Sequence, residues 1–300
     1  DGTMSDDDFM PENYKNLDRF EARDQIVNEL SELGFLVSAD DHVIQLPKGD
    51  RSKSILEPMI TDQWFVKTKE LADRGIAEVE NENMKFIPKN WEKTYFEWMY
   101  NIQDWCISRQ IWWGHQIPAW YDEDGNIYVA TTESEVREKY KLSDDLKLSQ
   151  DKDVLDTWFS SALWPFSTLG WPEESTDLKK YYPTSLLVTG FDIIFFWVAR
   201  MIMMGLNFND DVPFKDILIH GLVRDSKGRK MSKSLKNTID PLELSEKHGA
   251  DALRFSLIEK AAPGQDVPFD EEWTIAAKKF GNKLWNAAKF VHLYSPEEKR

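Results

Sequence analysis

The fold of this chain is decided by the stretch LLVTGFDIIFFWVARMIMM, residues 186–204, together with ILIHG, residues 217–221. The short apolar runs 186–188 and 217–219 are typical of buried strands, and residues 191–204 between them are long and apolar enough for a helix. A strand, a helix and a second strand predict a parallel βαβ unit. Because parallel sheets bind ligands at the carboxyl ends of their strands, we expect the site just after Val188 and Ile219.

The segments before this unit carry weaker patterns. Residues 18–33 repeat apolar side chains at helical spacing and stop at Gly34, and residues 35–37 and 43–46 have the pattern of short strands. A helix capped by Asn90 is expected to carry three of the tryptophans that recur every seven residues on one packed face: Trp91, Trp98 and Trp105.

The turn at residues 124–126 predicts a hairpin or small subdomain within 121–153. After the βαβ unit the pattern becomes helical, with helices expected over 241–248, 250–260 and 270–293. The sequence therefore predicts an α/β core followed by a helical segment.

The composition limits the function classes that the chain can serve. Its 53 acidic and 37 basic side chains leave a net charge of -16, which argues against a surface that coats nucleic acid or adheres to membranes. We expect no apolar run of the roughly 18 residues that a membrane span needs. The single cysteine, Cys106, permits no internal disulfide and no cysteine-based zinc cluster, so we expect a reducing, cytoplasmic location and no structural zinc.

One short segment reverses the overall charge. Residues 223–236 hold six basic side chains and one acidic one, Asp225, for a local charge of +5. Lys230 and Lys233, three residues apart and separated by a hydroxyl, could lie along a triphosphate and stabilise the charge that develops in phosphoryl transfer. A solvated basic loop is the alternative reading of the composition alone.

The order of residues within this loop carries a resemblance. Lys230-Met231-Ser232-Lys233-Ser234 is identical to the KMSKS signature of the class I aminoacyl-tRNA synthetases, and it follows a strand that ends in His-Gly as it does in that family. Residues 107–118, 153–161 and 189–197 resemble the valine-specific members, and residues 17–23 resemble the end of their inserted editing domain.

The resemblance implies an α/β fold, namely the second half of a class I synthetase nucleotide-binding, Rossmann-like fold with insertions, followed by an α-helical segment. It divides the chain into the tail of the editing domain (1–55), a connecting segment and the start of the second catalytic half (56–120), a small inserted subdomain (121–152), the catalytic half with the KMSKS loop (153–260) and the start of the helical stem-contact and anticodon-binding domain (261–300).

The resemblance also implies the site residues. Lys233 and Lys230 would be the catalytic groups, because they stabilise charge on the phosphates. The ATP site would consist of His220, Gly221, Leu222, Lys230, Met231, Ser232, Lys233 and Ser234. The valine and adenylate pocket would consist of Trp158, Gly190, Asp192, Ile193 and Trp197, in which the large rings exclude isoleucine and Asp192 accepts hydrogen bonds from the ammonium group and the ribose. No residue is expected to bind a metal.

The implied reaction activates valine with Mg²⁺-ATP to valyl-adenylate and then transfers the valyl group to tRNA(Val). A size filter cannot reject threonine, a limit for which valine-specific synthetases are themselves the known example, so editing is expected of the full protein. The family's His-x-Gly-His element is absent from this sequence. We therefore expect an internal fragment that is inactive by itself, from a monomeric protein with no membrane partner.

Two alternatives stay open at this point. One is a non-catalytic nucleotide- or tRNA-binding module that keeps a synthetase-like surface. The other is an isoleucine- or leucine-specific relative, which the residues Asp156-Thr157-Trp158 and the pair Ile193 and Trp197 disfavour.

Overall fold

The computed structural model describes residues 2–49, 52–56, 58, 60–233 and 235–294. The chain divides into two compact units, Asp1–Thr61 and Asp62–Arg300. The domain boundaries predicted above, at 55, 120, 152 and 260, stay predictions.

The first unit contains the predicted helix. α1 (Arg19–Glu32) is capped by Asp18, whose carboxylate accepts a hydrogen bond from the amide of Phe20, and Gly34 lies beyond its C-terminal end with a φ of +73°. The predicted strands at 35–37 and 43–46 are wrong, because neither run is hydrogen-bonded to a partner strand. Val37 and Val43 are 98% and 96% exposed, so apolar composition alone does not make a strand here.

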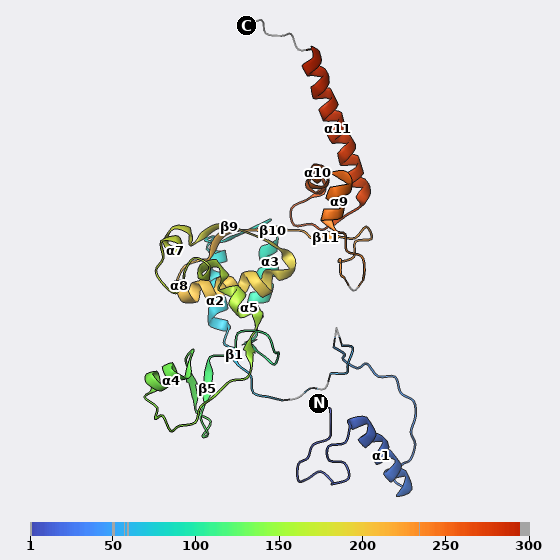
Figure 1. Cartoon of the computed structure of the whole chain (residues 1–300), viewed down its shortest axis with the longest axis vertical. Helices are drawn as coiled ribbons and strands as arrows, with labels where there is room; N and C mark the ends of the chain where they lie inside the picture. Colours follow the sequence, from blue (N-terminus) through green and yellow to red (C-terminus); the bar gives the residue numbers. More distant parts are fainter. Residues whose placement is uncertain (1, 50–51, 57, 59, 234, 295–300) are drawn as a thin grey trace. The chain divides into compact units, whose positions relative to one another are not determined.

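The second unit is built on the predicted βαβ unit, which the structure confirms. β9 (Thr184–Gly190) and β10 (Phe214–His220) run parallel, with Leu186 opposite Asp216 and Gly190 opposite His220 (Figure 1). A third parallel strand, β2 (Lys85–Ile87), pairs with the other edge of β10. β2 escapes the sequence analysis because three residues are too few to show a periodic pattern.

Three consecutive helical segments connect β9 to β10. They are a 3₁₀ turn, η1 (Phe191–Ile193), a π-helical segment, η2 (Ile194–Ala199), and α8 (Arg200–Asn209). Together with α2 (Lys69–Glu80) and α3 (Trp91–Tyr100) they bury one core against the sheet. Its fully buried members include Tyr95, Met99, Ile194, Ile202 and Ile217.

The connection between β9 and β10 contains a longer apolar run than was predicted from the sequence. Phe191–Asn209 is, within the part of the chain that the structure describes, the one helix whose length and mean hydropathy of 1.5 would suffice to cross a membrane, so the expectation that no run approaches this length was wrong. Burial of 56% of this segment in the core of the unit accounts for its composition.

The tryptophan spacing did not predict the helix correctly. α3 ends at Tyr100, so Trp105 lies instead in β3 (Trp105–Cys106), which pairs with β1 (Phe65–Val66), and Trp112 is fully exposed. Asn90 precedes α3 but its side chain makes no capping hydrogen bond. The seven-residue spacing of the tryptophans therefore does not show where the helix ends, because the spacing continues beyond Tyr100.

The predicted hairpin and the C-terminal helices are confirmed. β5 (Ala119–Tyr121) and β6 (Ile127–Val129) form the hairpin, joined by β7 (Ser149–Gln150) and α4 (Glu133–Tyr140). α9 (Pro241–His248), α10 (Ala250–Lys260) and α11 (Glu271–Tyr294) follow the sheet. Between α10 and α11 lies an unpredicted strand, β12 (Val267–Pro268), parallel to β11 (Val223–Arg224).

Five short elements complete the second unit. β4 (Ser108–Arg109) pairs with β8 (Val154–Leu155), and β8 leads into α5 (Thr157–Ala162). α6 (Trp164–Ser167) and α7 (Thr176–Tyr181) then lead to β9.

Candidate functional site

The carboxyl ends of β9 and β10 bring four of the predicted residues together. Gly190 and His220 are register partners, and Asp192 and Leu222 each follow two residues after a strand end. A Cβ atom added to Gly190 would lie 2.9 Å from Asp192 Oδ1, 3.4 Å from Leu222 Cδ2 and 3.7 Å from His220 Cε1. Any larger residue than glycine at position 190 would therefore crowd this edge.

Gly221 allows two backbone segments to touch. A Cβ atom at this position would lie 1.7 Å from the carbonyl oxygen of Gln265, which no side chain can tolerate. The next residue, Leu222, donates its amide to Asp266 Oδ1 at 2.8 Å and accepts from the amide of Val267 at 2.9 Å. Backbone groups thus dominate this wall, and Nδ1 of the exposed His220 ring lies 2.8 Å from the carbonyl oxygen of Gly221.

The KMSKS loop is organised around Asp225, the one acidic residue of the basic segment. Its buried carboxylate accepts hydrogen bonds from the amides of Lys227 and Arg229 at 3.0 and 2.8 Å and from Arg229 Nε at 2.8 Å. The Asn237 amide, first, and these Arg229 contacts lower the pKa of Asp225 from 3.8 to about 2.

Asn237 closes the loop from its other end. Its side chain accepts from the amide of Ser232 at 2.8 Å and donates to Asp225 Oδ2 at 2.9 Å and to the carbonyl of Lys230 at 3.2 Å. Sequence analysis missed both Asp225 and Asn237 as functional residues. The signal available for Asp225 was a lone carboxylate inside a run of cations.

The two lysines of the signature have different surroundings. Lys230 Nζ lies 3.3 Å from Asp192 Oδ2, so the loop reaches the strand edge. Lys233 is exposed and makes no side-chain hydrogen bond or ion pair with the described residues. Ser234 lies outside the described residues.

Met231 faces the C-terminal helices. It lines an apolar cavity of about 200 Å³ whose other walls come from β11, α9, α10 and the segment before α11: Val223, Ile239, Pro241, Leu244, Leu253, Leu257 and Phe269. The methionine therefore anchors the loop to the C-terminal helices, while Ser232 supplies its amide to Asn237.

The predicted valine-pocket residues lie where α5 meets η2. Trp158, on α5, stacks on Phe196 with ring centroids 6.0 Å apart, and Trp197 Nε1 donates to the carbonyl of Ser161 at 3.1 Å. Ile193 ends η1, one residue after Asp192, and joins this aromatic group to the strand edge. Each tryptophan thus contacts the helical segment that carries the other.

A cluster of charged side chains is centred on the buried Asp156, the residue that precedes α5. Asp156 caps α5 through the amide of Trp158, and its Oδ2 accepts from Trp105 Nε1 and Arg109 Nη2, each at 2.9 Å. Arg200 Nη1 lies 3.5 Å from the same oxygen. Burial lowers the pKa of Arg200 to about 10, an effect that Asp156 opposes. Sequence analysis missed this cluster, although an aspartate two residues before a helical tryptophan is a capping signal.

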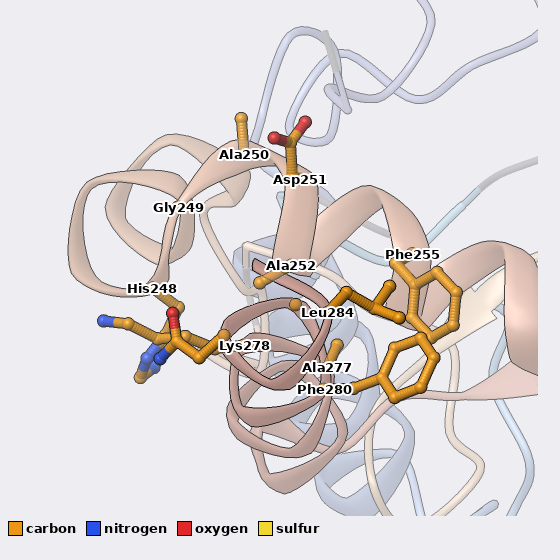
Figure 2. A pocket seen from close by; sticks show the side chains of 12 residues that line it. His248, Gly249, Ala250, Asp251, Ala252, Phe255, Ala277, Lys278, Phe280 and Leu284 are labelled. Atoms are coloured by element: carbon orange, nitrogen blue, oxygen red, sulfur yellow. The ribbon is translucent and has the colours of Figure 1, made fainter. Parts of the chain in front are cut away.

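A cavity of about 550 Å³ contains none of the predicted residues. It lies among α9, α10 and α11 and includes His248, Phe255, Lys278 and Phe280, of which the two phenylalanine rings stack at 5.3 Å (Figure 2). Nowhere in the described part of the chain do three His, Cys, Asp or Glu side chains converge as metal ligands would.

Comparison with known proteins agrees with the fold and the loop. The family described as tRNA synthetases class I (I, L, M and V) matches residues 5–270. Valine–tRNA ligases are among the similar curated proteins. That of Thermotoga maritima is 58% identical over 279 residues, covering 93% of this chain and 32% of its own length. That of Francisella tularensis is 51% identical over 319 residues, covering 94% and 35%.

Solved structures share the fold at low identity. Methionyl-tRNA synthetase of Mycobacterium tuberculosis, in complex with methionyl-adenylate, superposes with a TM-score of 0.56 at 21% identity, covering 77% of this chain and 40% of its own. The LeuRS of a LeuRS–tRNA–LeuAMS complex from Agrobacterium radiobacter K84 gives 0.52 at 21% identity, covering 60% and 27%.

The present chain spans about a third of the length of the curated relatives it matches. The family match extends over most of the chain, including the βαβ unit and the KMSKS loop that its edge contacts. The chain therefore belongs to the class I tRNA synthetases (I, L, M and V).

Proposed function

We propose that the protein carrying this chain is a valine–tRNA ligase, which activates valine with ATP and transfers it to tRNA(Val). The observation that carries the proposal is the 58% identity to the Thermotoga maritima valine–tRNA ligase over 93% of this chain. The contact between Lys230 and Asp192 supports it, because it joins the phosphate-binding loop to the edge where the amino acid would bind.

The chain's own residues suit the first reaction step. The valine carboxylate attacks the α-phosphate of ATP, and pyrophosphate leaves. The ammonium groups of Lys230 and Lys233 would stabilise the charge on the phosphates as it develops. No general base is required, because an ionised carboxylate is already a nucleophile.

Substrate binding would also rearrange the Lys230–Asp192 pair. A triphosphate attracts Lys230 more strongly than one carboxylate does, because it carries several negative charges. Released from Lys230, Asp192 can accept hydrogen bonds from the valine ammonium group and the adenylate ribose. Trp158, Trp197 and Ile193 would enclose the branched side chain.

The remaining parts of the proposal concern partners and location. Mg²⁺ would be held mainly by the phosphates of ATP, as is usual for this ion, since the described residues offer no cluster of ligands. Removal of mischarged threonine, a monomeric state, a cytoplasmic location and the absence of a membrane partner belong to the same proposal.

Lys233 gives the direct test. In the whole polypeptide encoded by the gene that carries this sequence, Lys233→Ala should lower valine-dependent pyrophosphate exchange by roughly two orders of magnitude or more, while the affinity for valine is largely kept. Lys147→Ala, which removes an exposed lysine of the inserted subdomain, is the matched control. Exchange that is unchanged in Lys233→Ala would contradict its role.

The choice of amino acid is tested in the same assay. A panel of valine, isoleucine, leucine and threonine should give the highest kcat/KM for valine. A preference for isoleucine or leucine would support the relative of different specificity, and no exchange with any amino acid would support a binding module. The 300-residue chain by itself should form no valyl-adenylate, because it lacks a His-x-Gly-His element.

A further inference from the structure

The two tryptophans of the proposed valine pocket lie on separate elements, so the size of that pocket depends on the distance between the two elements. Trp158 belongs to α5 and Trp197 to the π-helical segment η2, just before Arg200 begins α8. A π-helical turn is wider than an α-helical turn and is frequent at functional sites. The π-helical turn therefore changes the direction in which the aromatic side chains of η2 project relative to the side chains of α8.

Asp156 and Arg200 form the charged contact between these elements. Both residues are buried, at 5% and 7% exposed, and Arg200 Nη1 lies 3.5 Å from Asp156 Oδ2 without a hydrogen bond to any described residue. The same oxygen accepts hydrogen bonds from two donors, Trp105 Nε1 and Arg109 Nη2. Its other oxygen receives the amide of Trp158 itself, at 3.2 Å.

Arg200 contacts Trp105 and Phe196, and Phe196 is the residue on which Trp158 stacks. Its guanidinium carbon lies 3.9 Å from the ring centroid of Trp105 and 5.6 Å from that of Phe196. Phe196 in turn stacks on Trp158. A planar guanidinium can stack on rings and face a carboxylate at once, whereas an ammonium group cannot.

We propose that Asp156 and Arg200 are positioning residues that set the separation of the Trp158 and Trp197 walls and thereby the size of aliphatic side chain that the pocket accepts. This inference rests on the proposed function. Neither residue touches the substrate: Asp156 acts through the first turn of α5, and Arg200 acts through Phe196 and the start of α8.

The test uses Asp156→Asn and Arg200→Lys in the whole polypeptide. Asp156→Asn keeps the cap oxygen for Trp158 but removes the negative charge. Arg200→Lys keeps the positive charge but removes the planar fork. We expect the KM for valine to rise and the preference for valine over isoleucine to fall about tenfold, the scale of one methylene group in a fitted pocket. The KM for ATP should change little.

The readout separates positioning from mere structural support. If the pair only stabilises the fold, the variants will lower the melting temperature and leave the valine-to-isoleucine ratio of the active protein unchanged, which would overturn the inference. Glu133→Gln, which breaks the exposed Arg137–Glu133 pair of α4 at 2.6 Å, is the control and should change neither quantity. Trp105→Phe, which removes one donor to Asp156 and makes the ring under Arg200 smaller, replaces any variant that does not fold and should shift the same ratio.

Failure of the proposed function would look different. In that case the unmodified protein shows no valine-dependent exchange at all. An unmodified protein that prefers valine, with variants that keep the same ratio, would contradict only the role of Asp156 and Arg200.

Discussion

Asp225 and Asn237 show how single polar residues shape a loop whose other side chains repel one another. The two side chains accept hydrogen bonds from the amides of Lys227, Arg229 and Ser232, so the backbone is held while Lys233 stays exposed. A carboxylate that receives several hydrogen bonds is favoured in its charged form, which is why its pKa falls. The loop geometry therefore depends on the ionisation of Asp225.

The acid sensitivity of the loop follows from this pKa. The pKa of Asp225 is about 2 in the folded chain against an ordinary 3.8, so its stabilisation is complete above the ordinary value and is lost as pH falls toward 2. Carboxyl-carbon NMR should give a midpoint near 2. Hydrogen exchange of the Lys227 and Arg229 amides should accelerate over the same range, and Asp225→Asn should remove this dependence. A midpoint near 4 would contradict the network.

Gly221 offers a second prediction at this scale. Gly221→Ala should destabilise the chain by about 1–3 kcal/mol, because the added methyl group meets the Gln265 carbonyl and forces β11 and β12 apart. Gly281→Ala is the matched control, since a methyl group added there inside α11 would have no neighbour within 4 Å, and it should stabilise by up to about 1 kcal/mol. The free energy of unfolding of both variants should be measured in urea. Equal changes in the two variants would contradict the close approach of Gly221 to the Gln265 carbonyl.

At the scale of secondary structure, the sheet and its helices are held by one apolar core with an unusual polar member. Tyr95 of α3 is fully buried, and its hydroxyl has no hydrogen-bond partner among the described residues. Burial raises the pKa of this phenol well above its ordinary value. The Tyr95 ring packs in the apolar core, whereas its hydroxyl adds no hydrogen bond with the described residues.

Tyr95→Phe should therefore stabilise the chain by about 1 kcal/mol, since an unpaired buried hydroxyl costs about 1–3 kcal/mol and only part of that is recovered after the core relaxes. Tyr100→Phe is the comparison, because the Tyr100 hydroxyl is exposed and donates to Glu80 at 2.8 Å. The midpoint of urea unfolding measures both. A Tyr95→Phe variant less stable than the parent would show that the hydroxyl has a partner.

At the scale of the whole molecule, the chain is two compact units with different amounts of core. α1 of the first unit buries only Ala22, and the residues that follow it leave Phe35, Val37 and Val43 exposed. The second unit holds all three of the apolar clusters found among the described residues. The net charge of -16 is likewise a property of the whole, since the KMSKS loop is locally basic.

Limited proteolysis should reveal this difference. Chymotrypsin should cut first after Phe35, in an exposed segment without helix or strand, and should leave a resistant product that retains the sheet of β2, β10 and β9. Mass spectrometry identifies the first cut. A first cut between β9 and β10 would contradict the assignment of the stable core.

Much of the second unit was predictable because its signals are local. The apolar runs that became β9 and β10, the Asp240 and Gly249 boundaries of α9, and the Asp-Gly turn of the hairpin are each encoded within a few residues. The predicted strands of the first unit failed for the opposite reason, because a strand depends on a partner that the sequence does not identify. Trp105 illustrates the same limit: its spacing was helical, but its indole is held by Asp156, 51 residues away.

The sequence by itself determined the parallel βαβ unit, the C-terminal helices and the KMSKS loop, because apolar periodicity, helix caps and a contiguous motif are all read along the chain. Only the tertiary structure decided that Lys230 meets Asp192, that Asn237 and Asp225 hold the loop, and that Arg200 lies buried beside Asp156. Those pairs join residues 12 to 44 positions apart, and their energy depends on burial and on the approach of charged atoms in space. Neither quantity is written in the order of the residues.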